Sequence, residues 1–377
     1  MVKYYFKDLS DSWMRNRRKV IVYLSPFLCA SFLLLWFPWT NHTSHSFLTG
    51  LHLIVALFLY DAFYSCINVA WGALFAESTH DPITRVTAIK YSQFAILMSV
   101  NIISITEKLS HSLEETDGIM IERAALVPND EHAKIRSALS MALQVLKRLD
   151  FVVLVLTNFL HNCRSVSHLN FAAMAVKVLI PEETLPNGSW SKSFFFGACT
   201  VLPQVLIIGS GSFISKRGVY RVIMTSFILS IVSAIIFSIF AGNRPLLVML
   251  FMFFDSVLVH SIAPLFQILI AEFVDDDAKR LSRSKPISSL IFSLNALLVK
   301  PAQSITPVIV LFILGERYTN ALQAYDSAKF EEMEHEKTTM WSIVCSTPLL
   351  LATAQCFILR FYSLKNAHLS TRLSRNI

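Results

Sequence analysis

The stretch SLIFSLNALLVKPAQSITPVIVLFIL, residues 289–314, decides the class of this protein. It exceeds the roughly 20 apolar residues that cross a bilayer as a helix, and Lys300, near its middle, is its only charged side chain. An ammonium group inside hydrocarbon costs roughly 3 kcal/mol on insertion scales, so it needs an acidic partner, a water-filled cavity or a function. Lys300 is therefore the first candidate for a functional residue.

Eight further stretches are apolar over a similar length when they are read with a window of about 19 residues. The nine expected spans are residues 19–38, 48–76, 87–106, 151–178, 194–214, 220–241, 245–272, 287–314 and 340–361. Composition agrees, because 54% of the residues are hydrophobic and 16% are charged, whereas soluble domains carry about 25% charged residues. Buried parallel strands also give apolar runs, but not runs of this length with so few polar turns between them. We therefore expect an all-α, multi-pass transmembrane helical bundle in a lipid bilayer.

Motifs of common enzymes and metal sites are absent from the sequence. The six cysteines have no CxxC spacing, which favours small apolar packing residues over disulfides or a metal site. The sequence has no HExxH, P-loop, GxGxxG or GxSxG motif, so we expect neither an enzyme nor a bound cofactor. The net charge of +7 is what an excess of cytoplasmic Lys and Arg produces. It indicates anionic lipid head groups, rather than nucleic acid, as partners of the basic loops.

The distribution of Lys and Arg predicts the orientation in the membrane. Basic residues are dense before the first span, in 275–286 and in the C-terminal tail, so both termini are expected in the cytoplasm. The loops 179–193 and 315–338 then fall outside. Two glycosylation sequons, at Asn41 and Asn187, lie in loops that this argument assigns outside. The orientation fits either the plasma membrane or an endomembrane.

An odd number of spans conflicts with two cytoplasmic termini, and the conflict falls in residues 107–150. This stretch is rich in acidic residues and ends in the amphipathic run 132–149. The run is too polar to span comfortably, which favours a cytoplasmic linker with an interfacial helix. Either the topology is irregular there, or a span is missing from this chain.

Polar side chains share helical faces on several expected spans. In 48–76, Asp61, Ser65, Asn68 and Gly72 are spaced four, three and four residues apart, which places them along one stripe. In 151–178 a second stripe occupies one side of the helix and consists of Asn158, His161, Arg164, Ser165 and His168.

In the span 245–272, His260 and Gln267 are seven residues apart and are expected on one face, from which Asp255 is expected to point away. Asp61 and Lys300 lie near the middle of their spans and carry opposite charges. We therefore expect them to face each other or a shared aqueous cavity, and Pro301 to free a backbone carbonyl one turn back. The alternative is a structural ion pair with no substrate.

Several motifs, taken in order, resemble the major facilitator superfamily and its sugar–cation symporter branch, which includes melibiose permease. The run 11–19 is similar to the loop between family helices two and three, and the run 68–74 to the fourth helix. The run 271–277 resembles the end of the tenth helix, and 297–303 the middle of the eleventh. From residue 8 to about 365 the chain also resembles the animal group called transmembrane protein 180, or major facilitator domain-containing protein 13.

The resemblance implies a partial major facilitator fold that lacks helices one, two and six, which accounts for the odd number of spans. It implies four parts, namely an incomplete N-terminal bundle (1–106, helices three to five), a linker (107–150), a six-helix bundle (151–366) and a tail (367–377).

The resemblance also implies roles for three residues. Lys300 matches a symporter lysine near the cation and sugar site, Lys90 matches a basic residue near the sugar, and Asn68 stands where the symporters have an aspartate.

The leading hypothesis is a secondary transporter that moves a small polar solute, for which a sugar is one candidate, by alternating access. Sodium or a proton is the candidate coupling cation. The expected site residues are Asp61, Asn68, Lys90, Asn158, His161 and Lys300. The alternative is a non-transporting scaffold or pseudo-transporter, or a truncated non-functional isoform, which the neutral Asn68 and the lost helices favour.

Overall fold

A computed structural model describes most of the chain. The described residues are 17–36, 46–79, 81–110, 141–186, 189–241, 244–283, 287–323 and 330–365. They are helical apart from short turns and connections, and none of them lies in a strand. The expected all-α class is therefore confirmed.

The chain forms two compact units. The first consists of Met1–His80, Ser99–Val145 and Val274–Ala296, and the second of Asp81–Met98, Leu146–Phe273 and Leu297–Ile377. The expected boundaries at residues 106, 150 and 366 stay a prediction, because the two units group the helices by contact rather than by their order along the chain.

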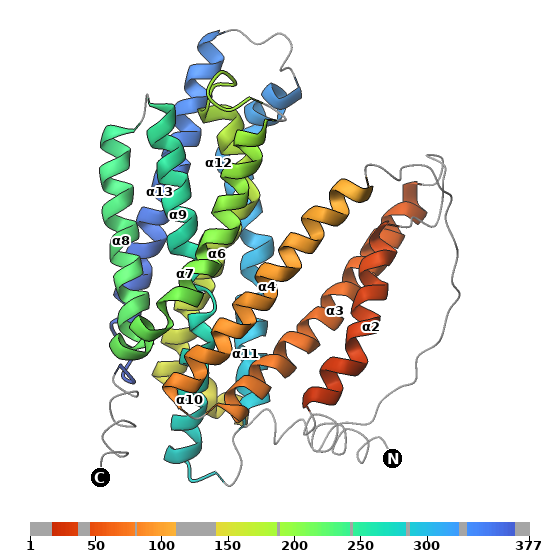
Figure 1. Ribbon diagram of the computed structural model, residues 1–377, viewed down its shortest axis with the longest axis vertical. Helices are drawn as coiled ribbons and strands as arrows, with labels where there is room; N and C mark the ends of the chain where they lie inside the picture. The colour runs from red at the N-terminus through yellow and green to blue at the C-terminus, as the bar shows by residue number, and fades with distance from the viewer. Residues whose placement is uncertain are drawn as a thin grey trace. The chain divides into compact units, whose positions relative to one another are not determined.

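In the first unit, helix α2 (Arg17–Trp36) packs against α3 (Ser46–Ser78) (Figure 1). Aromatic rings line their contact. The ring centroids of Phe27 and Phe63 are 5.8 Å apart, and those of Phe32 and Tyr60 are 5.9 Å apart. Van der Waals packing is a main force that holds helices together in lipid. Large aromatic rings suit this contact because each pair of rings packs over a wide area.

The second unit contains eight helices that lie wholly or largely within it, of which α4 (Pro82–Ser110) is the first along the chain. The other seven are α6 (Leu149–Leu179), α7 (Trp190–Arg217), α8 (Val219–Phe240), α9 (Pro245–Ile262), α10 (Leu265–Arg280), α12 (Pro301–Gln323) and α13 (Phe330–Leu359). Helix α13 packs on α6 and α8, α9 packs on α6, α7 and α8, and α12 packs on α6. Phe251 lies at the centre of this core, with its ring 5.3 Å from that of Phe237 and 5.8 Å from that of Trp341.

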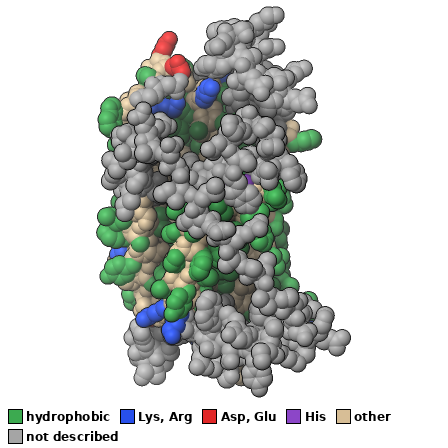
Figure 2. All heavy atoms as spheres, turned by 90° about the vertical axis from the view of Figure 1, so that its right-hand side faces the viewer, with side chains coloured by type: hydrophobic (Ala, Val, Ile, Leu, Met, Phe, Trp, Pro, Cys, Tyr) green, Lys and Arg blue, Asp and Glu red, His purple; other side chains and the backbone are tan. Residues whose placement is uncertain are grey.

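Six of the nine expected spans are long and apolar enough to cross a membrane, among the described residues. They are Arg17–Leu35, Leu51–Ser78, Trp190–Arg217, Val219–Phe240, Pro245–Arg280 and Lys337–Leu359. The other three expected spans correspond to α4 (Pro82–Ser110), α6, and α11 (Ser288–Val299) followed by α12. These are helical, but α4 and α6 carry more polar residues, and α11 is only 12 residues long. The protein is an integral membrane protein, and Figure 2 shows hydrophobic side chains over the middle of one face.

Two of the long apolar stretches are broken at a proline. Helix α11 ends at Val299 and α12 begins at Pro301, so that Lys300 occupies the turn between them and its carbonyl accepts from Gln303 N at 3.0 Å. Helices α9 and α10 are separated at Pro264 in the same way. Proline lacks the amide hydrogen that a continuous helix needs, so the expected disturbance at Pro301 takes the form of a complete interruption.

Outside the bilayer, the described helices run further than the expected spans. Residues 315–338 were expected to form an outer loop, but α12 continues to Gln323 and α13 begins at Phe330. Of the expected linker helix, the part at 141–146 is helical and precedes α6. The rest of 132–149 up to residue 140 lies outside the described residues.

Candidate functional site

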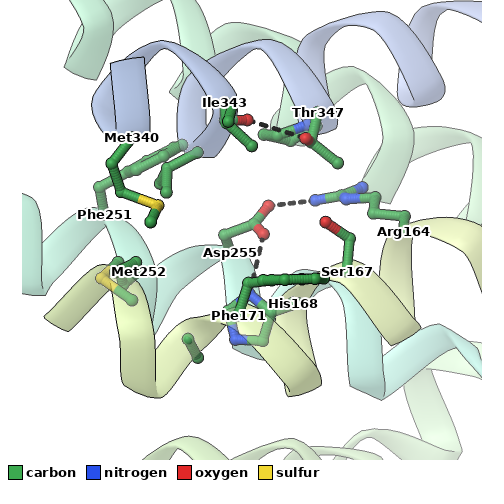
Figure 3. Close-up of a pocket in the computed structure, with 14 residues that line it drawn as sticks. Arg164, Ser167, His168, Phe171, Phe251, Met252, Asp255, Met340, Ile343 and Thr347 are labelled. Carbon is green, nitrogen blue, oxygen red and sulfur yellow. Dashed lines mark hydrogen bonds and ion pairs between the residues drawn. The ribbon is translucent and has the colours of Figure 1, made fainter. Parts of the chain in front are cut away.

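A buried ion pair joins the two most polar faces of the second unit. The Arg164 side chain on α6 is 1% exposed, and its Nη2 donates a short hydrogen bond to Asp255 Oδ1 on α9. The second carboxylate oxygen of Asp255 lies 3.3 Å from Nδ1 of His168. Figure 3 shows the carboxylate pointing toward both partners. One carboxylate therefore holds two side chains of α6.

The pair lies deep in the membrane-spanning part of its helices. Arg164 is the middle residue of α6. Asp255 is about ten residues from the start of α9 at Pro245, which is roughly 15 Å at the rise of an α-helix and about half of the roughly 30 Å hydrocarbon thickness. An ion pair at this depth is costly unless both charges are paired and further polar groups or water satisfy them.

Two more histidines extend the cluster. The rings of His168 and His260 meet edge to face with centroids 5.4 Å apart. His161, one turn before Arg164 on α6, is 2% exposed, lies 5.0 Å from the ring of Phe266, and interacts electrostatically with Arg164 and His260. The cluster therefore gathers several hydrogen-bond donors and imidazoles around a single carboxylate.

Several buried atoms of the cluster have no hydrogen-bond partner in the part of the chain that the structure describes. They are Nε and Nη1 of Arg164, both ring nitrogens of His161, and Nε2 of His260. Leaving a buried polar group unsatisfied costs about 1–3 kcal/mol. Water or a polar solute is the expected partner of such groups in a native protein.

A small cavity adjoins the ion pair. It has a volume of about 40 Å³ and is lined by polar groups of α6 and α9 and by Thr347 on α13, with apolar side chains elsewhere. One water needs about 10–15 Å³, so the cavity has room for water beside Asp255. Sites that enclose drug-sized ligands measure roughly 300–1,000 Å³, so a solute of that size would require the helices to move apart.

Comparison with known proteins agrees with a membrane carrier. Residues 182–366 match the family model described as MFS/sugar transport protein. This match covers the helices from α7 to α13, which are therefore similar to the major facilitator superfamily. The chain is also similar to transmembrane protein 180 of Gallus gallus, at 20% identity, and of Mus musculus, at 23% identity. Each match covers 79% of this chain and 64% of the relative, so the chain spans slightly under two thirds of the length of these relatives.

The major facilitator likeness expected from the sequence motifs is thereby confirmed, at low identity. Relatives named transmembrane protein 180 match over most of the chain, as the motifs between residues 8 and 365 predict. The site residues that the resemblance implies have to be considered one by one.

The predicted site residues are divided between the two units. Asp61 and Asn68 lie on α3 in the first unit, and both are exposed there. The second unit contains the other four, which are Lys90, Asn158, His161 and Lys300. Because Asp61 and Lys300 belong to different units, the expected pairing between them stays a prediction.

Within the second unit, Asn158 and His161 share the buried face of α6 with Arg164, as the stripe predicts. Lys90 lies apart from that face, over Gly211 of α7, where an added Cβ would come within 2.6 Å of Lys90 Cδ. The absence of a side chain at Gly211 therefore leaves room for the Lys90 side chain.

The expectation for Asp255 is wrong. It was expected to point away from the polar face, but it is 6% exposed and forms the centre of the charged cluster. Asp255 and His260 are five residues apart on the same helix, α9, which separates them by about 140° around the helix axis. Side chains of α6 nevertheless reach both, because His168 lies against the Asp255 carboxylate and the His260 ring. A sequence signal was available, because Arg164 and Asp255 are charges of opposite sign near the middle of two apolar stretches.

Some other expectations fall outside the described structure. The sequons at Asn41 and Asn187 lie outside the described residues, so glycosylation there stays a prediction. Among the described residues, no group of three or more His, Cys, Asp or Glu side chains is arranged to hold a metal ion.

Proposed function

We propose that this protein acts as a facilitator-type secondary transporter that moves a small polar solute across a membrane by alternating access. The observation that carries the proposal is the ion pair of Arg164 and Asp255, which is buried at mid-bilayer depth beside a cavity with room for water. Charged residues inside membrane bundles characteristically mark solute or ion pathways. The family match of residues 182–366 supports the same class of function.

The broken helices support a carrier as well. Secondary transporters often build their sites from discontinuous helices, whose interrupted backbone supplies unpaired carbonyl and amide groups to a polar cavity. The turns at Lys300 and at Pro264 interrupt two long apolar stretches of the second unit. Lys300 lies at one interruption and His260 four residues before the other, so we keep Lys300 among the candidates for the solute pathway and add His260 to them.

For the solute we propose a hydroxyl-rich or otherwise polar small molecule, with sugars as the first class to test. The matching family is described as sugar transport, and a buried Arg and Asp offer donors and acceptors to hydroxyl groups. For the coupling cation we propose a proton over sodium, because Asp255 contacts His168 and the latter is beside His260. Imidazoles accept protons but do not suit sodium, which prefers oxygen ligands.

The first experiment measures uptake of labelled monosaccharides and polyols into proteoliposomes that contain the full chain, with an imposed proton or sodium gradient. We expect uptake with wild type and a large loss in Asp255→Asn and Lys300→Ala. The matched control is Glu182→Gln, which removes a carboxylate from the connection between α6 and α7. Equal uptake by wild type and Lys300→Ala would remove Lys300 from the mechanism.

A second experiment requires no knowledge of the solute. Ser167 lines the cavity, so a Ser167→Cys variant in a background without the six native cysteines reports access to the site. We expect a charged, membrane-impermeant thiol reagent to modify it from at least one side of the membrane. Lack of modification from either side, together with no uptake of any tested solute, would refute the carrier proposal.

The second candidate function is a non-transporting scaffold. It is favoured by the good pairing of Asp255 with two partners, because a satisfied ion pair also fixes the orientation of α6 and α9 without any solute. It predicts that no sugar or polyol raises the thermal unfolding midpoint of the purified protein.

A further inference from the structure

Five basic side chains gather at one end of the second unit, away from the buried ion pair. Lys216 and Arg217 end α7, Arg221 is in the first turn of α8, and Arg360 and Lys365 follow α13. Four of the five are exposed, and Lys365 is half-buried. We call these residues, with Tyr220 and Tyr362, the basic–tyrosine cluster.

The fold holds the two sequence-distant parts of the cluster together. Helices α8 and α13 pack side by side, and their lower ends meet in Figure 1. The rings of Tyr220 and Tyr362 stack with centroids 6.3 Å apart, and Lys365 Nζ lies 5.7 Å from the Tyr220 ring. Tyr362 is fully buried, and its hydroxyl donates to Leu269 O at 3.4 Å. The segment after α13 is thereby fixed against the start of α8.

A glycine brings Arg217 and Arg221 close to each other. Gly218, between α7 and α8, has a φ of 86°, and its amide donates to Ile214 O. Residues with a Cβ rarely adopt this conformation, so glycine permits the abrupt reversal of the chain. Because the connection is a single residue, the basic end of α7 directly adjoins the basic first turn of α8.

The positive charge of the cluster is not neutralised by the protein in the part of the chain that the structure describes. None of its five basic side chains forms an ion pair there. Asp150, at the start of α6, is an acidic residue whose partner Ser363 lies between Arg360 and Lys365 in the sequence. It accepts hydrogen bonds from the amide and hydroxyl of Ser363 at 2.7 and 2.9 Å, and it forms no ion pair with the cluster. The cluster therefore keeps five positive charges available to an external anion.

The position of the cluster selects the kind of anion. Helices α7, α8 and α13 are three of the stretches that qualify as membrane spans, so their ends lie at the level of the lipid head groups. Apolar side chains continue directly from the cluster toward the bilayer. Phe213 is 54% exposed with Arg217 over its ring at 5.5 Å, and Phe361 is 56% exposed next to Arg360. A ligand that is anionic at one end and hydrocarbon at the other fits both features.

We propose that the basic–tyrosine cluster is a binding site for the phosphate head group of an anionic phospholipid, with the acyl chains against Phe213 and Phe361. Clusters of four to eight Lys and Arg at the membrane surface typically bind phosphatidylserine or phosphoinositides. Arginine favours the site because its planar guanidinium donates two parallel hydrogen bonds to phosphate. This site is separate from the proposed solute pathway and does not depend on transport.

The test titrates short-chain phosphatidylinositol bisphosphate into the full chain purified in neutral detergent, with lipid occupancy read by native mass spectrometry. The controls for the ligand are short-chain phosphatidylcholine and free inositol trisphosphate. We expect saturable binding of the anionic lipid and weak binding of both controls. Equal binding of phosphatidylcholine would refute an anion site, and equal binding of inositol trisphosphate would refute the assignment to a lipid.

Variants locate the site on the protein. Each basic residue near a membrane surface contributes about a fivefold increase in affinity, so Arg221→Gln should weaken binding about fivefold and Arg221→Gln/Arg360→Gln about 25-fold. The matched control is Arg244→Gln, which removes an exposed arginine before α9. Arg360→Lys keeps the positive charge at its position, so it should bind the lipid more tightly than Arg360→Gln. An equal loss in Arg244→Gln, or no loss in the double variant, would refute the proposed location. The melting temperature without lipid shows whether each variant is folded.

Discussion

The ion pair between Arg164 and Asp255 makes a sharp prediction about stability. In the variant Asp255→Leu, the guanidinium of Arg164 stays buried but loses its carboxylate partner. In the double variant Arg164→Met/Asp255→Leu, both charges are replaced by apolar groups. The two variants therefore separate the cost of an uncompensated charge from the net contribution of the pair.

The magnitude follows from the burial of the two groups. Arg164 and Asp255 side chains are 1% and 9% exposed, so solvent screens them little. Breaking a buried ion pair by removing one partner costs about 3–5 kcal/mol, whereas replacing both partners by apolar groups is often neutral or stabilising by about 1–4 kcal/mol. Asp255 also accepts from His168 at 3.3 Å, so the single variant leaves a second donor unpaired and should fall in the upper part of its range.

The assay is thermal unfolding of the purified full chain in detergent, followed by the fluorescence of the native tryptophans. With roughly 2–4 °C per kcal/mol for 150–250 residues, Asp255→Leu should lower the unfolding midpoint by about 6–20 °C. The double variant should restore most of this loss. His168→Ala, which removes one hydrogen bond to a charged group, should cost about 1.5–3 kcal/mol.

The same variants distinguish a structural from a functional role. If the pair serves only to orient α6 and α9, the stable double variant should behave like wild type in uptake and in thiol labelling of Ser167→Cys. If the pair lies on a solute pathway, the double variant should be folded but inactive. Our reasoning on burial is refuted if Asp255→Leu melts at the wild-type temperature, because a buried guanidinium cannot lose its partner without cost.

The first unit yields two further predictions. Gly72→Ala should destabilise it by about 1–3 kcal/mol, because a Cβ there would lie 2.3 Å from the Phe292 ring. Gly197→Ala is the matched control in a helix, since its Cβ would meet nothing within 4 Å, and equal melting of the two variants would contradict the prediction. Glu77→Gln should cost about 1–3 kcal/mol because Glu77 accepts from Arg17 Nη2 at 2.9 Å, and an unchanged rate of proteolysis of α2 would show that the bond contributes nothing.

The sequence predicts the helical class well because hydrocarbon leaves few alternatives. A bilayer requires every backbone polar group to be satisfied within a helix or a closed barrel, so the length of an apolar run nearly determines its structure. The interruption at Lys300 was predictable for a similar reason, because Pro301 removes an amide donor whatever surrounds it. Local chemistry decides both features, and no knowledge of the neighbouring helices is needed.

The partner of a polar side chain is harder to predict, and Asp255 shows why. The angle between two residues on a helical wheel has meaning only while the helix is continuous. The break at Pro264 separates Gln267 from His260 in this way. Asp255 and His260 share α9, however, and the His168 side chain of α6 contacts both of them, although they are about 140° apart on the helix. The partner of Asp255 also comes from a helix about 90 residues earlier in the chain, and no local pattern specifies which helices become neighbours.

The buried pair suggests a general rule for choosing candidate functional residues in membrane-spanning helices. A charge at mid-bilayer depth is costly on its own, so each one should be matched with an opposite charge at similar depth on another span before helical faces are compared. For the second unit this rule pairs Arg164, the middle residue of α6, with Asp255, about halfway across the hydrocarbon on α9. Depth is the better guide because it depends only on distance along each helix, whereas a side chain such as His168 reaches positions on more than one face of its neighbour, as its contacts with Asp255 and His260 show.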